Sequence, residues 1–304
     1  MVEYENKYWN LGCENIAGID EAGRGPLAGP VIATSVIFSK YTNIEGIKDS
    51  KKLSEKKRNA LYEIIYKNSK SIGIGEVDVK IIDKINILQA TFLAMRQSIG
   101  NLKIKPDKIL VDGNRADIKH YDQENIIKGD SKSISIASAS IISKVYRDNL
   151  MKQYDKIFPE YGFINHNGYG TRLHLEKLKK FGPSIIHRKS FKPIKSLKVS
   201  KIKNKNMIAQ NFALILNKKK TIIHIDYNSK IINNSIIICK SNHCYDITII
   251  CSEDHNHKKI TPQLNNEIIN QYKLNNINNI KYHLIIPKIT DSKINFSLIK
   301  SETF

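Results

Sequence analysis

Hydrophobic and polar positions along the first two thirds of the chain repeat with the periods of strands and helices. Short apolar runs bounded by Gly, Pro or acidic residues predict strands, and longer stretches with apolar residues three or four positions apart predict helices. A Gly- and Pro-rich turn joins the first two strands, which predicts an antiparallel hairpin. In chain order the predicted elements are strands at residues 15–20 and 30–38, a helix at 54–69, a strand at 71–78, a helix at 85–102, a strand at 108–113 and a helix at 134–154. This order predicts the α/β class, with a mixed sheet that has helices packed on it.

The composition changes sharply near residue 195. All fifteen Gly and every Arg precede this point, whereas the remainder is rich in Ile, Asn and Lys. We therefore predict two parts, residues 1–195 and a basic extension at residues 196–304. Residues 221–228 and 234–240 alternate as strands do, so the extension is either disordered or a small β-rich appendage.

The chain is strongly basic. Its 304 residues carry 49 Lys and Arg against 29 Asp and Glu, a net charge of +20 that attracts polyanions such as nucleic acids. No run approaches the ~18 consecutive apolar residues that a membrane span needs, and the acidic, polar N-terminus does not resemble a signal peptide. The four unevenly spaced cysteines do not suggest a disulfide scaffold. We expect a cytoplasmic protein with free thiols and no membrane partner.

Four carboxylates stand beside glycines at the ends of the predicted elements. Asp20 and Glu21 end the first strand, Asp112 ends the last strand of the series, and Asp130 precedes the last helix. Hard divalent cations such as Mg²⁺ bind carboxylate oxygens together with water and substrate phosphate. Two such ions about 4 Å apart could activate a water molecule and stabilise the leaving 3′ oxygen of a phosphodiester. The set indicates a metal-dependent phosphodiester hydrolase.

Each of these acids also has an ordinary structural interpretation. Asp112, followed by Gly and Asn, fits a turn, and Asp130 fits a helix N-cap. Asp20 and Glu21 could form a structural ion pair with Arg24 at the hairpin turn. Only the combination of all four favours a metal site.

Six segments of the first part hold all four of these acids and nine of the fifteen Gly residues. They are GIDEAGRGPLAGPV (18–31), KDSKKLSEKKR (48–58), ILVDGN (109–114), KGDSKSISIASASIISKVYRD (128–148), HNGYGTRLH (166–174) and GPSIIHRKSF (182–191). In order and approximate spacing they resemble the successive blocks of the ribonuclease HII family, over residues 14–193. Ala22 and Arg24 stand where the related ribonuclease HIII enzymes usually have Ser and Lys, so the chain is more similar to ribonuclease HII.

This resemblance implies a ribonuclease H-like α/β fold, a mixed sheet flanked by helices with a helical C-terminal part, followed here by the Ile/Asn/Lys-rich extension. It implies an endoribonuclease H that hydrolyses the RNA strand of RNA/DNA hybrids and incises duplex DNA on the 5′ side of single ribonucleotides, leaving 3′-hydroxyl and 5′-phosphate ends. Asp20, Glu21, Asp112 and Asp130 match the family's catalytic, metal-binding carboxylates, which would hold two Mg²⁺ or Mn²⁺ ions. The expected partners are RNA/DNA hybrids and ribonucleotide-containing duplex DNA, bound by a monomer.

Selection of such a substrate requires the detection of one 2′-hydroxyl. A site whose polar groups point at that hydroxyl is penalised when it is absent. Gly23 and Gly25 would let the main chain approach the sugar, with Arg24 between them near a phosphate. The resemblance implies that this segment acts with Tyr169, whose ring would stack on the deoxyribose that follows the ribonucleotide. From local sequence alone, the more ordinary interpretation of Tyr169 is a half-buried aromatic residue in a Gly-flanked turn.

Basic residues near these segments are candidate phosphate contacts, which add salt-dependent affinity without reading sequence. The candidates are Lys51 and Arg188, together with Lys52, Lys144, Arg147, His187 and Lys189. His166 and His174 flank Tyr169 and are either phosphate contacts or structural hydrogen-bond donors.

Two other functions and one further metal site are alternatives to this interpretation. A hybrid-binding protein without catalysis would lose affinity from four acids that repel phosphate. A polynucleotidyl transferase of the resolvase or integrase type would lack the Gly-Arg-Gly segment and its Tyr partner. In the extension, the spacing of Cys239, His243, Cys244, Cys251, His255 and His257 does not match the paired CxxC layout of common zinc modules.

Overall fold

The computed structural model describes residues 1–47, 53–114, 116–118 and 120–197 of the first part of the chain. In the remainder it describes residues 210, 213–214, 216–217, 221–226, 235–241, 244–250, 271, 280–289 and 294–303. The chain forms two compact units, one made of Met1–Met151 with Ile164–Ser200 and the other of Lys152–Phe163 with Lys201–Phe304. Along the described residues, no helix is long and apolar enough to cross a membrane.

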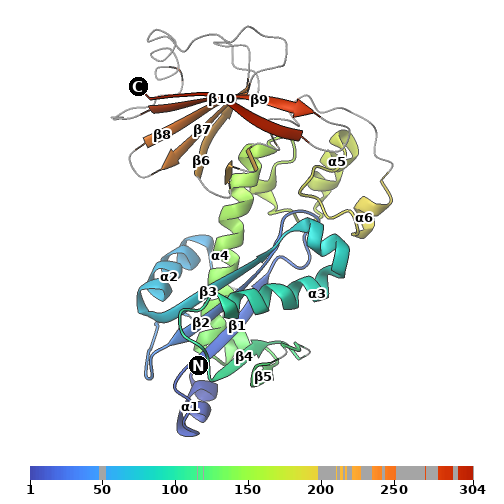
Figure 1. The fold of residues 1–304 in the computed structure, drawn as a ribbon. Helices are drawn as coiled ribbons and strands as arrows, with labels where there is room; N and C mark the ends of the chain where they lie inside the picture. The colour runs from blue at the N-terminus through green and yellow to red at the C-terminus, as the bar shows by residue number, and fades with distance from the viewer. Residues whose placement is uncertain are drawn as a thin grey trace. The chain divides into compact units, whose positions relative to one another are not determined.

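The first unit is built on a five-stranded mixed sheet in the order β3-β2-β1-β4-β5 (Figure 1). Its strands are β1 (Ile16–Ala22), β2 (Val31–Phe38), β3 (Ser69–Val77), β4 (Lys108–Asp112) and β5 (Gln123–Ile126). β1 pairs antiparallel with β2 and parallel with β4, and β4 pairs parallel with β5. The predicted hairpin and the predicted mixed sheet are therefore confirmed. Because β1 and β4 run in the same direction, their carboxyl ends lie at the same end of the sheet.

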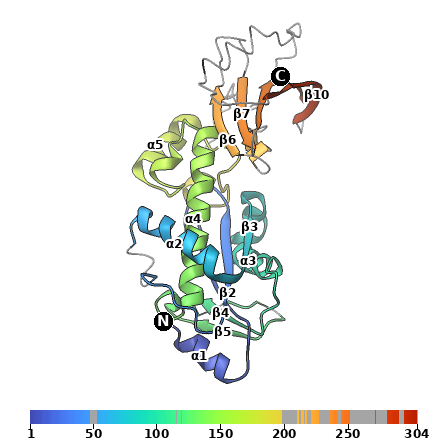
Figure 2. The same cartoon turned by 90° about the vertical axis from the view of Figure 1, so that its left-hand side faces the viewer.

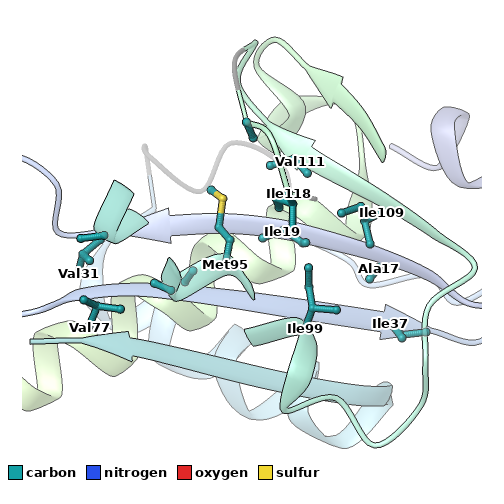
Figure 3. Packing of buried hydrophobic residues seen from close by; sticks show 14 of the residues in the cluster. Ala17, Ile19, Val31, Ile37, Val77, Met95, Ile99, Ile109, Val111 and Ile118 are labelled. Atoms are coloured by element: carbon teal, nitrogen blue, oxygen red, sulfur yellow. The ribbon is translucent and has the colours of Figure 1, made fainter. Parts of the chain in front are cut away.

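Helices pack on both faces of this sheet. The helical elements are α1 (Glu3–Asn10), α2 (Glu55–Asn68), α3 (Val79–Gly100), the 3-10 turn η2 (Gly129–Ser131), α4 (Ile134–Ile157), the 3-10 turn η3 (Phe163–Asn165), α5 (Arg172–Phe181) and α6 (Lys192–Lys195). α3 packs on one face, and α2 and α4 pack on the other (Figure 2). Figure 3 shows Ile19 and Val111 of the sheet gathered with Met95 of α3 in the first of these two apolar layers.

The close packing of α4 on the sheet depends on a glycine in β1. A Cβ at Gly18 would lie 2.2 Å from the carbonyl carbon of Ser135 and 2.3 Å from the backbone nitrogen of Ile136. Any side chain would therefore push α4 away from the strand that carries Asp20. Small residues of this helix, Ala137 and Ala139, are fully buried in one apolar cluster with Val36 of β2.

Three elements differ from the sequence prediction. α3 begins at Val79 instead of residue 85, because Asp78 caps an extra first turn by accepting a hydrogen bond from the Ile81 N–H. Asn86 then interrupts the helix with a φ of 68°. The Asn86 side-chain oxygen accepts hydrogen bonds from the N–H groups of Leu88 and Gln89, so Asn86 is the N-cap of the helical segment that follows it. α1 and the four-residue β5 were not predicted, since both are short and mostly polar.

The second unit contains a five-stranded sheet in the order β10-β9-β8-β7-β6. Its strands are β6 (Thr221–Asp226), β7 (Ser235–Ser241), β8 (Cys244–Ile250), β9 (Ile280–Ile289) and β10 (Ile294–Thr303). β6 and β7 are the two strands that the alternating pattern predicts. The chain from residue 152 to 163 belongs to this unit, where Lys156 Nζ donates to the carbonyl of Ile222. Four of the six residues in the Cys/His cluster of the extension lie outside the described residues.

Candidate active site

The first two acids of the site come from the end of β1. β1 lies between β2 and β4: its pairing with β4 ends at Ile19, and its last residues stay paired with β2. Asp20 is almost fully buried, and its Oδ1 accepts a hydrogen bond of 2.8 Å from the N–H of Glu21. Ser143 of α4 donates to the carbonyl of Asp20 at 3.1 Å. The helix that packs against Gly18 therefore also holds the backbone of this acid.

Parallel pairing brings the third acid beside the first. Ile19 of β1 is the register partner of Val111 of β4, so Asp20 and Asp112 follow at adjacent strand ends. Asp112 Oδ1 accepts a hydrogen bond of 2.7 Å from the N–H of Gly129. This bond ties β4 to the short turn that carries the fourth acid.

Asp130 follows Gly129 in η2 and is itself buried. The turn approaches β4 closely because Gly129 has no side chain, and a Cβ there would lie 2.6 Å from Ile136 Cδ1 and 3.3 Å from Asp112 Oδ1. Asp130 is therefore placed next to the strand end that carries Asp112. The four acids predicted from sequence come from three elements, β1, β4 and η2, and are brought to one end of one sheet.

The electrostatics of these acids show that they act on one another. Burial, followed by the negative charges of Glu21 and Asp112, raises the pKa of the Asp20 carboxyl well above its ordinary value. Hydrogen bonds from Ser140 and from the Glu21 backbone oppose this shift. Burial also raises the pKa of Glu21, against the attraction of the Arg24 guanidinium. The structure therefore concentrates more negative charge at this end of the sheet than its neighbours neutralise.

This donor set fits a divalent cation. Carboxylate oxygens in a partly desolvated site are the ligands that Mg²⁺ and Mn²⁺ prefer. A cation bound between the acids would remove the repulsion that raises the pKa values of Asp20 and Glu21. Among the described residues, the four acids included, no three His, Cys, Asp or Glu side chains are grouped so that they could hold a metal ion as they stand, so the fit of a cation rests on the oxygen donors of these acids and on their common place at the end of the sheet.

The Gly-Arg-Gly segment follows directly on Glu21. Arg24 Nη1 lies 3.2 Å from Glu21 Oε1, while half of the Arg24 side chain remains exposed. Gly23 has a φ of 90°, and a Cβ there would lie 2.2 Å from Nε of Arg147. Only glycine fits both the backbone conformation and the space at this position.

The Tyr169 side chain lies close to Gly25. A Cβ on Gly25 would lie 3.6 Å from Tyr169 Cε1, and the Tyr169 ring is 47% exposed. The two loops are joined by a backbone hydrogen bond of 2.7 Å from the N–H of Leu27 to the carbonyl of Gly168. The structure therefore presents an exposed aromatic ring beside a main chain without side-chain cover.

Two basic residues proposed as phosphate contacts have a different position. Arg188 is fully buried, and its guanidinium donates to the carbonyls of Gly23, Arg24, Gly29 and Pro30. Arg147 is also buried and donates to the carbonyls of Ala28, Pro30 and Asn167. The prediction that these guanidinium groups contact phosphate is wrong, because their N–H groups face backbone carbonyls. Both arginines instead hold the segment of residues 23–30 in place.

The other lysines predicted to contact phosphate lie at the surface or outside the described residues. Lys144 and Lys189 are exposed, whereas Lys51 and Lys52 lie outside the described residues. Ser140 and Ser143, which contact Asp20, were not named as site residues. The run of small residues in their helix predicted close packing but not which hydroxyl groups reach the acid.

Comparison with known proteins identifies the first unit. A family model described as ribonuclease HII matches residues 17–194. The chain belongs to the ribonuclease HII family. It is 54% identical over 188 residues to the ribonuclease HII of Clostridioides difficile (strain 630), which covers 62% of this chain and 74% of that protein.

Two further comparisons agree with this assignment. The ribonuclease HII of Francisella philomiragia subsp. philomiragia is 54% identical over 182 residues, which is 60% of this chain and 98% of that protein. The crystal structure of ribonuclease H2 from Pyrococcus horikoshii OT3 superposes with a TM-score of 0.51 and 28% identity, over 60% of this chain and 95% of that chain. The chain is thus an endoribonuclease that acts on RNA/DNA hybrids, with the ribonuclease H-like fold, whose members depend on divalent metal ions.

Proposed function

We propose that this ribonuclease HII also incises duplex DNA on the 5′ side of a single embedded ribonucleotide and leaves 3′-hydroxyl and 5′-phosphate ends. The observation that carries the proposal is the position of the Tyr169 ring beside Gly25. A ring stacked on a sugar leaves no room for a 2′-hydroxyl, so it favours deoxyribose at that position. The exposed main chain of Gly25 leaves space for polar contacts to the neighbouring ribose, whereas Gly23 is buried against Arg147 and serves the shape of the turn, contrary to the expectation that it approaches the sugar.

We assign the chemistry to Asp20, Glu21, Asp112 and Asp130, which would hold two Mg²⁺ or Mn²⁺ ions. Bound ions supply positive charge that lowers the pKa of the attacking water and stabilises the leaving 3′ oxygen. Lys51 stays a proposed phosphate contact. Arg24 contributes an exposed guanidinium beside Glu21, where it can hold the phosphate that follows the ribonucleotide.

We propose that residues 1–195 form the catalytic part and that residues 196–304 add mainly charge. The extension carries 16 Lys and 7 acidic residues, and the family match ends at residue 194. A chain that ends at residue 200 should keep its cleavage activity and lose affinity mainly at low salt, where counterion release matters most. A truncated protein that is folded but inactive would show that the extension completes the site.

The decisive experiment uses four duplexes that differ only in sugar. One holds a single ribonucleotide, one a run of ribonucleotides, one a complete RNA strand, and one none. Each is incubated with the purified protein in Mg²⁺, in Mn²⁺ and in EDTA, and the ends are mapped. We expect a single nick 5′ of the lone ribonucleotide, dependent on metal and extendable by a DNA polymerase. Cutting on the 3′ side with a cyclic phosphate, or equal cutting of the all-DNA duplex, would contradict the proposal.

A further inference from the structure

Three buried histidines, His166, His174 and His187, form a cluster beside the turn that carries Tyr169. His174 belongs to the first turn of α5, His166 precedes the Tyr169 turn, and His187 lies in the loop before α6. The rings of His166 and His174 stack with centroids 4.4 Å apart. His174 Nε2 lies 3.0 Å from His187 Nε2, and His174 Nδ1 lies 2.9 Å from the carbonyl oxygen of Tyr169.

The hydrogen bonds of this cluster fix which nitrogen carries each proton. A backbone N–H can only donate, and the N–H of Ser184 lies 2.9 Å from His187 Nδ1. His187 Nδ1 therefore accepts, and a neutral His187 must carry its proton on Nε2. That proton points at His174 Nε2, which must accept it. The proton of His174 consequently lies on Nδ1, where it is donated to the carbonyl of Tyr169.

Burial keeps the imidazole rings of His174 and His187 neutral. It lowers the pKa of His174 to about 4 and lowers that of His187 well below its ordinary value. A positively charged His174 would place two N–H groups face to face across the 3.0 Å contact with His187. The hydrogen bonds therefore all run in one direction: Ser184 donates to His187, His187 donates to His174, and His174 donates to the carbonyl of Tyr169.

The Tyr169 carbonyl is the end of this relay. It also accepts a hydrogen bond of 2.8 Å from the N–H of Thr171, and the Tyr169 N–H donates to the carbonyl of His166 at 2.8 Å. The ring of Tyr169 is about half exposed, so its position depends on how firmly this backbone is held.

We infer that the Ser184–His187–His174 relay is a positioning device for Tyr169 and thereby sets the preference for a ribonucleotide followed by a deoxyribonucleotide. This inference rests on the proposed function of Tyr169. His174 and His187 are positioning residues, and none of the three histidines is assigned contact with the nucleic acid. The effect of the relay on Tyr169 passes through the Tyr169 carbonyl, which the His174 ring contacts.

Paired substitutions of His174 separate this role from simple packing. An Asn amide nitrogen reaches the place of His Nδ1, whereas a Gln amide reaches the place of Nε2. His174→Asn should keep the bond to Tyr169 and cut the single-ribonucleotide duplex within about threefold of the unchanged protein. His174→Gln should lower kcat/KM on that duplex by about tenfold, the cost of one lost buried hydrogen bond, while kcat on the all-RNA hybrid changes less than about twofold. His120→Gln, at an exposed histidine, is the matched control.

The protonation pattern can be measured directly in the unchanged full-length protein. Long-range proton–nitrogen correlation spectra at neutral pH should show His174 protonated on Nδ1 and His187 protonated on Nε2. The opposite tautomers, or a charged His174, would overturn the inference even if no His174 variant folds. A folded His174→Gln protein that loses equal activity on the single-ribonucleotide duplex and on the all-RNA hybrid would also overturn the inference, because the role of His174 would then be structural only. If the unchanged protein shows no preference for a lone ribonucleotide, the proposed function fails, while the spectra still decide whether the relay exists.

Discussion

Replacement of Arg188 by Met is the sharpest test of how the segment of residues 23–30 is held. The Met side chain has similar length and apolar volume but no hydrogen-bond donor. In the structure the Arg188 guanidinium is fully buried and donates to the carbonyls of Gly23, Arg24, Gly29 and Pro30. The substitution therefore removes this donor from four carbonyls, of which that of Pro30 keeps a bond from Arg147 and that of Arg24 is partly exposed.

The expected loss of stability follows from these contacts. A buried acceptor that loses its partner costs about 1–3 kcal/mol, and such costs add incompletely when the backbone relaxes together. We expect a decrease of about 4 kcal/mol in the free energy of unfolding. For a unit of this size about 1 kcal/mol corresponds to roughly 2–4 °C, so Tm should fall by roughly 10 °C. Cleavage should fall as well, since the same segment leads directly from Glu21 to Gly25.

Thermal unfolding and salt-dependent hybrid binding distinguish this role from a phosphate contact. A residue that neutralises one phosphate changes the slope of log K against log salt by about one unit and leaves Tm unchanged. A residue that braces the segment from inside lowers Tm and leaves the slope unchanged. Lys189→Met is the matched control, because Lys189 is the next residue, is exposed and loses the same charge. An Arg188→Met protein with unchanged Tm and a reduced salt slope would refute the reasoning.

Three further predictions concern the acids, the ring and the histidines. Asp112→Asn should abolish cleavage and leave hybrid binding intact, because the amide oxygen can still accept the bond from the turn after β5 while the ligand charge is lost; activity within about tenfold would argue against a metal ligand. Tyr169→Ala should reduce cutting at a lone ribonucleotide far more than Lys177→Ala, measured as kcat/KM on the two variants, and equal effects would remove the sugar-stacking role. Because burial lowers the pKa of His174 to about 4 and that of His187 as well, only the unfolded chain takes up their protons as pH falls below about 6.5. The free energy of unfolding should therefore fall between pH 7 and pH 5 in urea titrations, by up to about 1.4 kcal/mol per pH unit for each histidine, and a rise over this range would contradict the assignment.

The positions of the acids could be predicted because they depend on strand ends. The apolar runs locate β1 and β4 to within a residue or two, and parallel pairing then brings Asp20 and Asp112 together. The position of Asp130 could not be predicted from strand ends. It depends on the left-handed conformation of Lys128 and on the hydrogen bond from the Gly129 N–H to Asp112. The spacing of residues in the sequence predicts neither the Lys128 conformation nor this hydrogen bond.

The roles of the buried polar residues could not be predicted from the sequence. A long basic side chain beside a Gly-rich segment is equally compatible with an outward phosphate contact and an inward contact to carbonyls. The path of the backbone decides between them, and for Arg147 and Arg188 it turns the carbonyls of the segment inward. The same holds for His174, whose proton position follows from partners 5 and 13 residues away.

The choice of arginine over lysine at position 188 follows from the geometry of the turn that it holds. The four carbonyls belong to both ends of one turn, Gly23 and Arg24 at its entry and Gly29 and Pro30 at its exit. A lysine ammonium has three donors on one atom and cannot reach four acceptors, whereas the planar guanidinium has five donors spread over three nitrogens. One buried side chain can therefore fasten entry and exit together, and the middle of the turn, with Gly25, is left facing Tyr169. Because this fastening acts on the backbone that joins Glu21 to Gly25, weakening it should impair cutting of every substrate, whereas weakening the histidine relay should impair only the choice among them.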